Sequence, residues 1–232
     1  MLRPVAAELR KIGDEIWATQ APMVVFGLLD IGTRMTVIRL ADGGLFLHSP
    51  TPLDTAPRAA VDALGPVRCI VAPNYVHHLY VGDWKRAYPQ ALLLGAPGLD
   101  TKRRDLAWDA ILGETPHPAY GASLDQVLLA GAPYMNEIAF FHRASRTLLL
   151  TDAAFHPTPA SSRGARVWMK LTTVRDGFGP NALVRWFIRD RRAMRASIDR
   201  VLAWDFDRVT VTHGEVLESG GRAALARAYA WL

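Results

Sequence analysis

Short apolar runs separated by turn-forming residues dominate the first fifty residues of the chain. Two extended runs, Met23–Leu29 and Met35–Leu40, precede an Asp-Gly pair and the apolar segment Leu45–His48. An Asp-Gly pair between apolar runs is a strong hairpin signal, because glycine accepts the positive φ of a tight turn. We therefore expect a β-meander in this region, preceded by a short helix at Val5–Lys11.

Helical and strand-like patterns alternate through the middle of the chain. The strand-like runs are almost wholly apolar, as in strands that are buried on both faces. This alternation is typical of βαβ units, in which neighbouring strands pair in parallel. The helices are expected at Thr51–Leu64, Asp83–Tyr88 and Asp100–Leu112, and the strands at Val67–Val71 and Ala91–Leu94.

The rest of the chain combines a second hairpin with an arginine-rich helical segment. Its elements are expected at Val127–Leu129, Ile138–Phe141 and Thr147–Leu150 (strands), Ala182–Trp204 (one long helix), Val209–Thr212 (strand) and Gly220–Leu232 (helix). Strands at both ends with βαβ units between them predict an α/β sandwich with mixed sheets. No segment has the composition of a linker, so we expect a single domain over residues 1–232, with residues 1–14 as a peripheral helix.

Composition narrows the classes of protein that remain. Half of the 232 residues are hydrophobic and 21% are charged, which is a globular composition. The single cysteine, Cys69, excludes an intramolecular disulfide and any multi-cysteine metal site. No apolar stretch is long enough to span a membrane, and the charged N-terminal segment does not resemble a secretory signal. We therefore expect a cytoplasmic protein without a membrane partner.

Polar residues with metal-ligand chemistry stand directly beside the apolar strands. His77 and His78, Asp152, and His213 each follow such a strand, where open α/β sheets commonly place their sites. Glu137 precedes another strand and could be a ligand, a base that holds a histidine, or a surface residue. Each position also has a structural alternative, since a lone histidine often caps a helix or packs in the core, and an aspartate often caps a turn.

The order of these features resembles the metallo-beta-lactamase fold, a four-layer αββα sandwich with two mixed sheets and metal bound at the sheet edge. Over residues 15–232 the amino-acid sequence resembles one uncharacterised branch of that superfamily, the domain of unknown function 4336 (DUF4336) family. The segments that carry this resemblance are Leu45–Pro50, Ala72–Tyr80, Tyr88–Ala91, Thr147–Asp152, Trp204–Arg208 and His213–Glu215.

The chain departs from the usual first metal-binding motif of the superfamily, His-x-His-x-Asp-His. Pro73 and Tyr75 stand where the first two histidines belong, His77 falls at the aspartate, and only His78 keeps its place. Pro133 stands roughly where a further histidine is usual. The resemblance therefore implies that the first metal position is lost.

By the same comparison, the chain keeps the ligands of the second metal position. Asp152 matches its bridging aspartate and His213 its last histidine, with His78 as the third ligand and His77 beside them. This implies a reduced, mononuclear site in which His77, His78, Asp152 and His213 are the candidate ligands. Glu137 and His77 are the candidate catalytic groups.

The function implied by this site is a metal-dependent hydrolase that acts on an unknown small-molecule substrate. We expect one divalent metal, with zinc ahead of iron or manganese, because two histidines and one carboxylate suit all three. The alternative is a non-catalytic protein of the same fold that holds no metal and binds a ligand or a partner.

The arginine-rich helix raises the question of a nucleic-acid partner. Arg185, Arg189 and Arg192 recur at helical spacing, with Trp186 and Phe187 among them. The same spacing is typical of a solvated helix face opposite an apolar one. Because 27 basic residues exceed 22 acidic ones by only five, we do not expect nucleic-acid binding.

Overall fold

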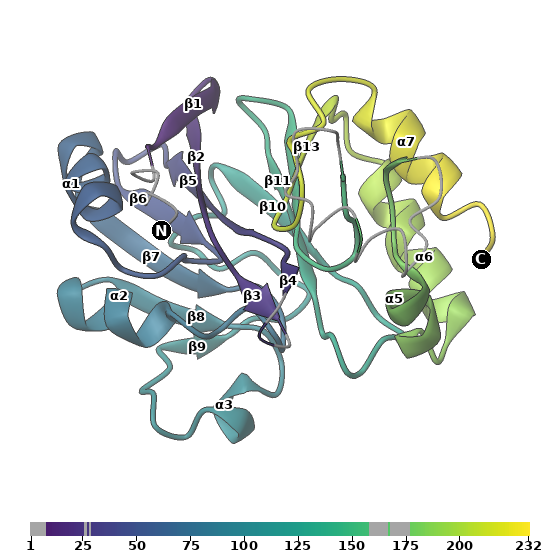
Figure 1. Cartoon of the computed structure of the whole chain (residues 1–232), viewed down its shortest axis with the longest axis horizontal. Coiled ribbons are helices and arrows are strands. Elements are labelled where there is room, and N and C mark those ends of the chain that lie inside the picture. Colours follow the sequence, from purple (N-terminus) through teal and green to yellow (C-terminus); the bar gives the residue numbers. More distant parts are fainter. Residues whose placement is uncertain (1–7, 26, 28, 158–166, 168–176) are drawn as a thin grey trace.

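Two β-sheets pack face to face in the computed structural model, and helices cover their outer faces (Figure 1). The structure describes residues 8–25, 27, 29–157, 167 and 177–232. Helices α1 and α2 lie on one side, and α5, α6 and α7 on the other. This arrangement is the four-layer αββα sandwich of the metallo-beta-lactamase fold.

The first sheet has seven strands in the order β1-β2-β5-β6-β7-β8-β9. Neighbouring strands are antiparallel from β1 to β6 and parallel from β6 to β9. The strands are β1 (Arg10–Gly13), β2 (Ile16–Ala21), β5 (Thr33–Arg39), β6 (Leu45–His48), β7 (Val67–Ala72), β8 (Leu92–Gly95) and β9 (Ala110–Ile111). The expected hairpin around Gly43 is present, and this glycine has a φ of 83°.

The second sheet has four strands in the order β10-β11-β12-β13. Its first three strands are antiparallel, while β12 and β13 are parallel. The strands are β10 (Leu124–Leu128), β11 (Ile138–His142), β12 (Thr147–Leu150) and β13 (Arg208–Val211). A separate two-stranded ribbon consists of β3 (Val24–Val25) and β4 (Leu29–Asp30).

The helices of the described residues are mostly short. They are α1 (Thr55–Leu64), α2 (Val81–Ala87), α3 (Leu99–Lys102), α5 (Ala182–Phe187), α6 (Arg191–Leu202) and α7 (Gly221–Ala228). None of the described helices is long and apolar enough to cross a membrane.

Apolar residues form two clusters, one on each side of the second sheet. The larger cluster joins the first sheet, α1 and α2 to the inner face of the second sheet. At its centre the ring of Phe46 meets those of Tyr120 and Phe140 edge-on, with centroids 5.1 and 5.4 Å away. The smaller cluster packs α5, α6 and α7 on the outer face of the second sheet. The two sheets therefore share one apolar interface, which fixes how their edges meet.

Several expected elements differ in the structure. The helix expected at Val5–Lys11 lies partly outside the described residues, and Arg10–Gly13 form strand β1 instead. Strand β2 was not predicted. The helix expected at Asp100–Leu112 is reduced to α3, and the carboxylate of Asp109 accepts a hydrogen bond from the backbone N–H of Leu93 at 2.8 Å. That bond holds the later part of the segment extended beside β8.

The long helix expected at Ala182–Trp204 is divided into α5 and α6. The backbone N–H groups of Arg189 and Asp190 both donate to the carbonyl of Gly131, at 2.8 and 3.1 Å. The side chain of Asp190 then caps α6 by accepting from the N–H of Ala193 at 3.0 Å. These contacts replace the bonds that a continuous helix would make.

Candidate metal centre

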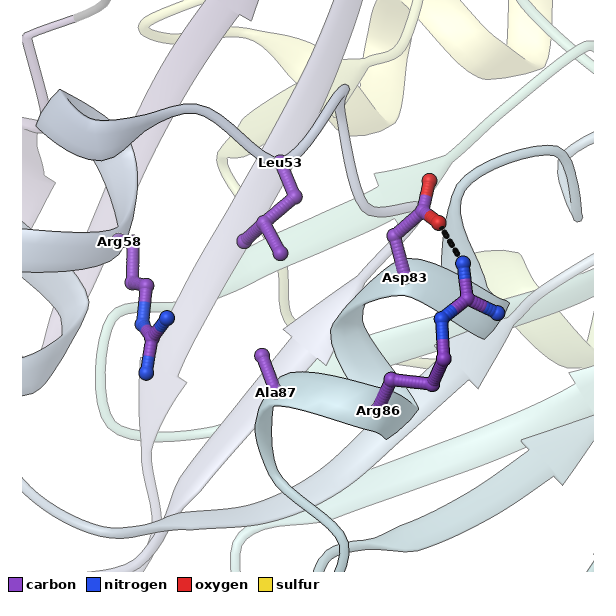
Figure 2. Close-up of a pocket in the computed structure, with 5 residues that line it drawn as sticks. All are labelled: Leu53, Arg58, Asp83, Arg86 and Ala87. Carbon is purple, nitrogen blue, oxygen red and sulfur yellow. Dashed lines mark hydrogen bonds and ion pairs between the residues drawn. The ribbon is translucent and has the colours of Figure 1, made fainter.

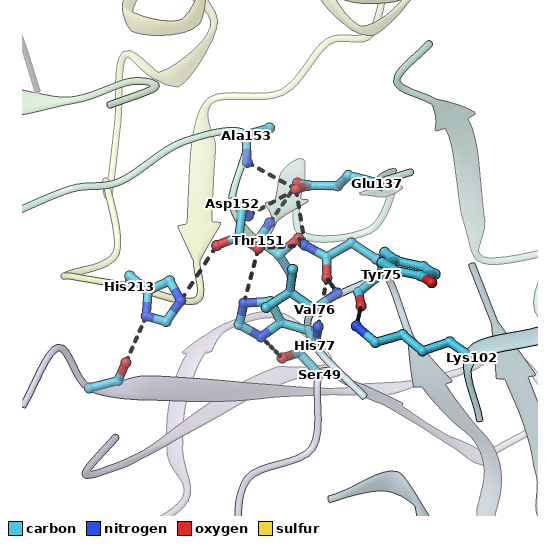
Figure 3. Close-up of polar contacts among 12 residues, drawn as sticks. Ser49, Tyr75, Val76, His77, Lys102, Glu137, Thr151, Asp152, Ala153 and His213 are labelled. Carbon is cyan, nitrogen blue, oxygen red and sulfur yellow. Dashed lines mark hydrogen bonds and ion pairs between the residues drawn. The ribbon is translucent and has the colours of Figure 1, made fainter. Parts of the chain in front are cut away.

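His77, Asp152 and His213 converge where the two sheets meet (Figure 3). One ligand atom from each residue lies within 4.8 Å of the others. The Nε2 atom of His77 is 3.4 Å from Oδ2 of Asp152, and Nε2 of His213 is 3.6 Å from Oδ1 of the same carboxylate. The carboxylate thus lies between two imidazoles.

The three side chains come from loops at the carboxyl ends of strands. His77 follows β7 in the first sheet, while Asp152 and His213 follow the parallel strands β12 and β13 in the second. Gly214 lets the chain turn directly after His213, since its φ is 107° and a Cβ atom there would lie 2.2 Å from the carbonyl oxygen of His156. The ends of both sheets therefore supply one site.

The remaining nitrogen of each imidazole is held by a partner outside the group. Nδ1 of His213 lies 2.7 Å from the carbonyl oxygen of Gly32, which can only accept, so this nitrogen carries the proton. Nδ1 of His77 lies 3.0 Å from the hydroxyl of Ser49. In both residues Nε2 is the atom that faces Asp152, which is the arrangement common among metal-ligating histidines.

The pKa values of His213 and Asp152 are both lower than usual. Burial, helped by His77, lowers the pKa of His213 to about 4, so its imidazole is neutral near pH 7. Burial alone would raise the pKa of Asp152. The imidazoles of His77 and His213 and the amide of Asn74 have the larger, opposite effect, so the pKa lies below its usual range. The lone pair on Nε2 of His213 therefore faces a carboxylate oxygen, with no proton between them.

A buried asparagine that sequence analysis missed organises the site. The Oδ1 atom of Asn74 accepts from the backbone N–H groups of Val76 and His77, at 2.8 and 2.6 Å. Its Nδ2 atom donates to Oδ2 of Asp152 at 2.7 Å and to the hydroxyl of Thr151 at 2.9 Å. Asn74 thus joins the His77 loop of the first sheet to the Asp152 loop of the second. The only sequence signal was its place just after a buried strand.

Glu137 supports the Asp152 loop from inside the protein. Its side chain is fully buried, and its carboxylate accepts from the backbone N–H groups of Thr151, Asp152 and Ala153 at 2.7, 2.8 and 2.9 Å. Burial and the neighbouring Asp152 carboxylate raise its pKa, while the N–H donors of Thr151 and Ala153 lower it. Its Oε2 atom also accepts from Nδ2 of Asn74 at 3.5 Å, and neither oxygen belongs to the group of three ligand atoms.

His78 lies outside the group, although it is the next residue after His77. Its Nδ1 atom is 3.0 Å from Nη1 of Arg103, which also donates to the His78 carbonyl at 3.2 Å. Burial, together with Lys102 and Arg103, lowers the pKa of His78 to about 4. The two adjacent imidazoles are therefore directed to different surroundings.

Comparison with known protein families identifies the family of this chain. A model of the domain of unknown function DUF4336 matches residues 13–161. The chain belongs to the DUF4336 family. The matched part contains His77, Glu137 and Asp152, whereas His213 lies beyond it. No curated protein matches the sequence.

Solved structures of metallo-beta-lactamase fold resemble this DUF4336 protein along nearly its whole length. A metallo-beta-lactamase from Pontibacter korlensis is 12% identical, with a TM-score of 0.65 and coverage of 96% of this chain and 97% of that one. One from Hirschia baltica is 13% identical, with the same TM-score and 96% of each chain covered. The metal-soaked Flv1 flavodiiron core from Synechocystis is 12% identical, with a TM-score of 0.66 over 97% of this chain and 60% of that one. At these identities the likeness establishes the fold alone.

A depression on the surface of the DUF4336 protein lies away from these residues, between α1 and α2 (Figure 2). An ion pair between Asp83 and Arg86 forms part of its wall. Its lining residues are Leu53, Arg58, Asp83, Arg86 and Ala87. None of them belongs to the group around Asp152, so the depression does not extend the candidate metal centre.

Proposed function

We propose that this DUF4336 protein is a metal-dependent hydrolase with a mononuclear site. The ligands are Nε2 of His77, the carboxylate of Asp152 and Nε2 of His213. The observation that carries the proposal is the Gly32 carbonyl at Nδ1 of His213, which directs a lone pair on Nε2 at the Asp152 carboxylate. A cation between these atoms would convert a repulsive contact into coordination. The buried Nε2 atom of His77, which has no hydrogen-bond partner among the described residues, fits the same cation.

The chain's own residues provide the rest of the site. Three protein ligands leave room for a water molecule, and a bound metal would lower the pKa of that water to produce a nucleophile near neutral pH. Asn74 holds Oδ2 of Asp152 and orients its carboxylate. Glu137 fixes the backbone on which Asp152 stands. The buried surroundings of the group restrict water around the reacting atoms.

Zinc is the first metal to test, with iron and manganese after it. Two imidazoles and one carboxylate suit zinc and ferrous iron alike. The likeness to a structure titled as a flavodiiron core keeps iron in the comparison. We propose a small-molecule substrate and a cytoplasmic location. The mild positive charge of the chain does not require a nucleic-acid partner.

Adjacent histidines provide a matched pair of variants for the test. We expect about one equivalent of metal in the wild type and in His78→Ala, and well under one in His77→Ala and His213→Ala. Elemental analysis after reconstitution with Zn²⁺, Fe²⁺ or Mn²⁺ measures this directly. Loss of metal in His78→Ala but not in His77→Ala would instead select His78 as the ligand. A wild type that binds no metal would leave the non-catalytic alternative.

Catalysis is tested separately, with the loaded protein. Ester, phosphodiester, lactone and thioester substrates can be screened with wild type and His77→Ala at equal protein concentration. We expect hydrolysis of at least one class by the loaded wild type, and a loss of that activity in His77→Ala in parallel with its metal. Equal activity in both proteins would identify a contaminant and contradict the proposal.

A further inference from the structure

Ser49 occupies a strained position directly after strand β6. Its φ is 52°, in the left-handed region that non-glycine residues rarely adopt, and its residue surface is only 2% exposed. Such strain persists where the surroundings hold it, and it often occurs at functional sites. Here the conformation allows the backbone N–H to donate to the Val71 carbonyl at 3.1 Å while the hydroxyl lies 3.0 Å from Nδ1 of His77 (Figure 3).

The chain of contacts from Ser49 through His77 to Asp152 has the residue types of a hydrolytic triad. A serine nucleophile also needs backbone donors for the oxyanion, commonly including the N–H that follows the serine. That residue is Pro50, which has no N–H, and the N–H of Ser49 itself is bonded to Val71. With the side chain buried as well, the hydroxyl has no access to a substrate, and its effect must act through His77.

The two imidazoles of the centre have outer partners of different chemistry. The Gly32 carbonyl beside His213 can only accept a hydrogen bond, so it permits one tautomer. The Ser49 hydroxyl beside His77 can either donate or accept. Nδ1 of His77 can therefore remain bonded whether Nε2 carries a proton toward Asp152 or offers a lone pair to a cation.

We propose that Ser49 is the positioning residue of His77, and that its hydroxyl holds the imidazole ring in place both with and without a bound cation. This inference rests on the proposed metal centre and adds the group that prepares one of its ligands. Without the hydroxyl, the buried Nδ1 atom would lose its partner and the ring would lose its fixed orientation. Metal affinity should then fall, even though no ligand has been removed.

Two variants separate the hydroxyl from the backbone strain. Ser49→Ala removes the hydroxyl and keeps the strain, whereas Ser49→Gly removes both. Thr51→Val is the matched control, because Thr51 is also buried and its hydroxyl has no hydrogen-bond partner among the described residues. We expect zinc affinity, measured by competition with a chromophoric chelator, to fall by about 10- to 100-fold in Ser49→Ala and Ser49→Gly. Thr51→Val should stay close to the wild type.

A spectroscopic readout distinguishes positioning from general stability. Cobalt(II) loaded into the wild type should give visible absorption bands that report the ligand geometry, and these bands should change in Ser49→Gly but not in Thr51→Val. Wild-type zinc affinity and wild-type cobalt bands in Ser49→Gly would overturn the inference. A wild type that binds neither metal would instead refute the proposed function, so the two failures are distinguishable.

Discussion

Glu137 is a buried carboxylate whose partners are three backbone N–H groups and, at 3.5 Å, the side-chain amide of Asn74. In Glu137→Gln one acceptor oxygen becomes an NH₂ group that opposes those N–H donors. We expect the free energy of unfolding to fall by about 2–4 kcal/mol, because buried donors lose their acceptor. Urea denaturation of the metal-free protein measures this loss.

The matched control for that variant is Glu114→Gln. The Glu114 side chain is 53% exposed and pairs with Arg200 at the surface. Exposed pairs contribute little, so its unfolding free energy should stay within about 1 kcal/mol of the wild type. Equal losses in the two variants would show that the carboxylate of Glu137 is not specially held.

The candidate site shows which side chains a sequence can identify and which it cannot. Asp152 and His213 became candidate ligands because each follows an apolar strand and because the order of these segments resembles the metallo-beta-lactamase fold. The motif comparison selected His78 as the third ligand, whereas the structure brings His77 into the group and directs His78 to Arg103. That choice depends on Ser49 and on Arg103, which are distant in sequence and come together only in the fold.

At the scale of elements, the sequence predicted paired strands better than helix lengths. Both hairpins and the parallel pairing of β7 with β8 follow from local turns and from apolar runs. The division between α5 and α6 could not be predicted, because the segment keeps a helical pattern throughout. Gly131, which is far away in the sequence, supplies the carbonyl that interrupts the helix.

Asp190 makes that interruption testable. Its side chain accepts from the N–H of Ala193 and so caps α6. Asp190→Ala should lower the free energy of unfolding by about 1 kcal/mol, whereas Asp190→Asn should retain most of the stability because asparagine caps equally well. Urea unfolding curves of the two variants provide the comparison, and an Asp190→Ala curve that overlays the wild type would contradict the capping role.

At the scale of the whole molecule, the metal centre is also a junction between the two sheets. Asn74 and His77 belong to the first sheet, and Thr151, Asp152 and His213 to the second. Hydrogen bonds from Asn74 cross this junction beside the shared apolar interface. The carboxylate of Asp152 therefore takes part in a direct contact between the two sheets.

Buried histidines should make the fold sensitive to acid. Burial lowers the pKa of His48 to about 3, with a contribution from His77, and that of His142 to about 4. Histidines in an unfolded chain titrate near pH 6.5. As the pH falls below about 6.5, these histidines bind protons in the unfolded chain but stay neutral in the folded protein. The free energy of unfolding therefore decreases down to about pH 4. Glu137 acts in the opposite sense, because its raised pKa favours proton uptake by the folded state.

Urea unfolding of the metal-free protein at pH 7, 6, 5 and 4 tests this linkage. Each unit of pKa difference corresponds to about 1.4 kcal/mol, and the lowered pKa values of His48 and His142 both act toward a decline. His142→Gln removes one titrating group at the hairpin end of β11, where His142 pairs with Thr147 and Asp152 follows the other end of β12, and its stability should decline less steeply between pH 6.5 and 4. A steep decline that is identical in His142→Gln would assign the acid sensitivity to other groups, with His48 the next to replace.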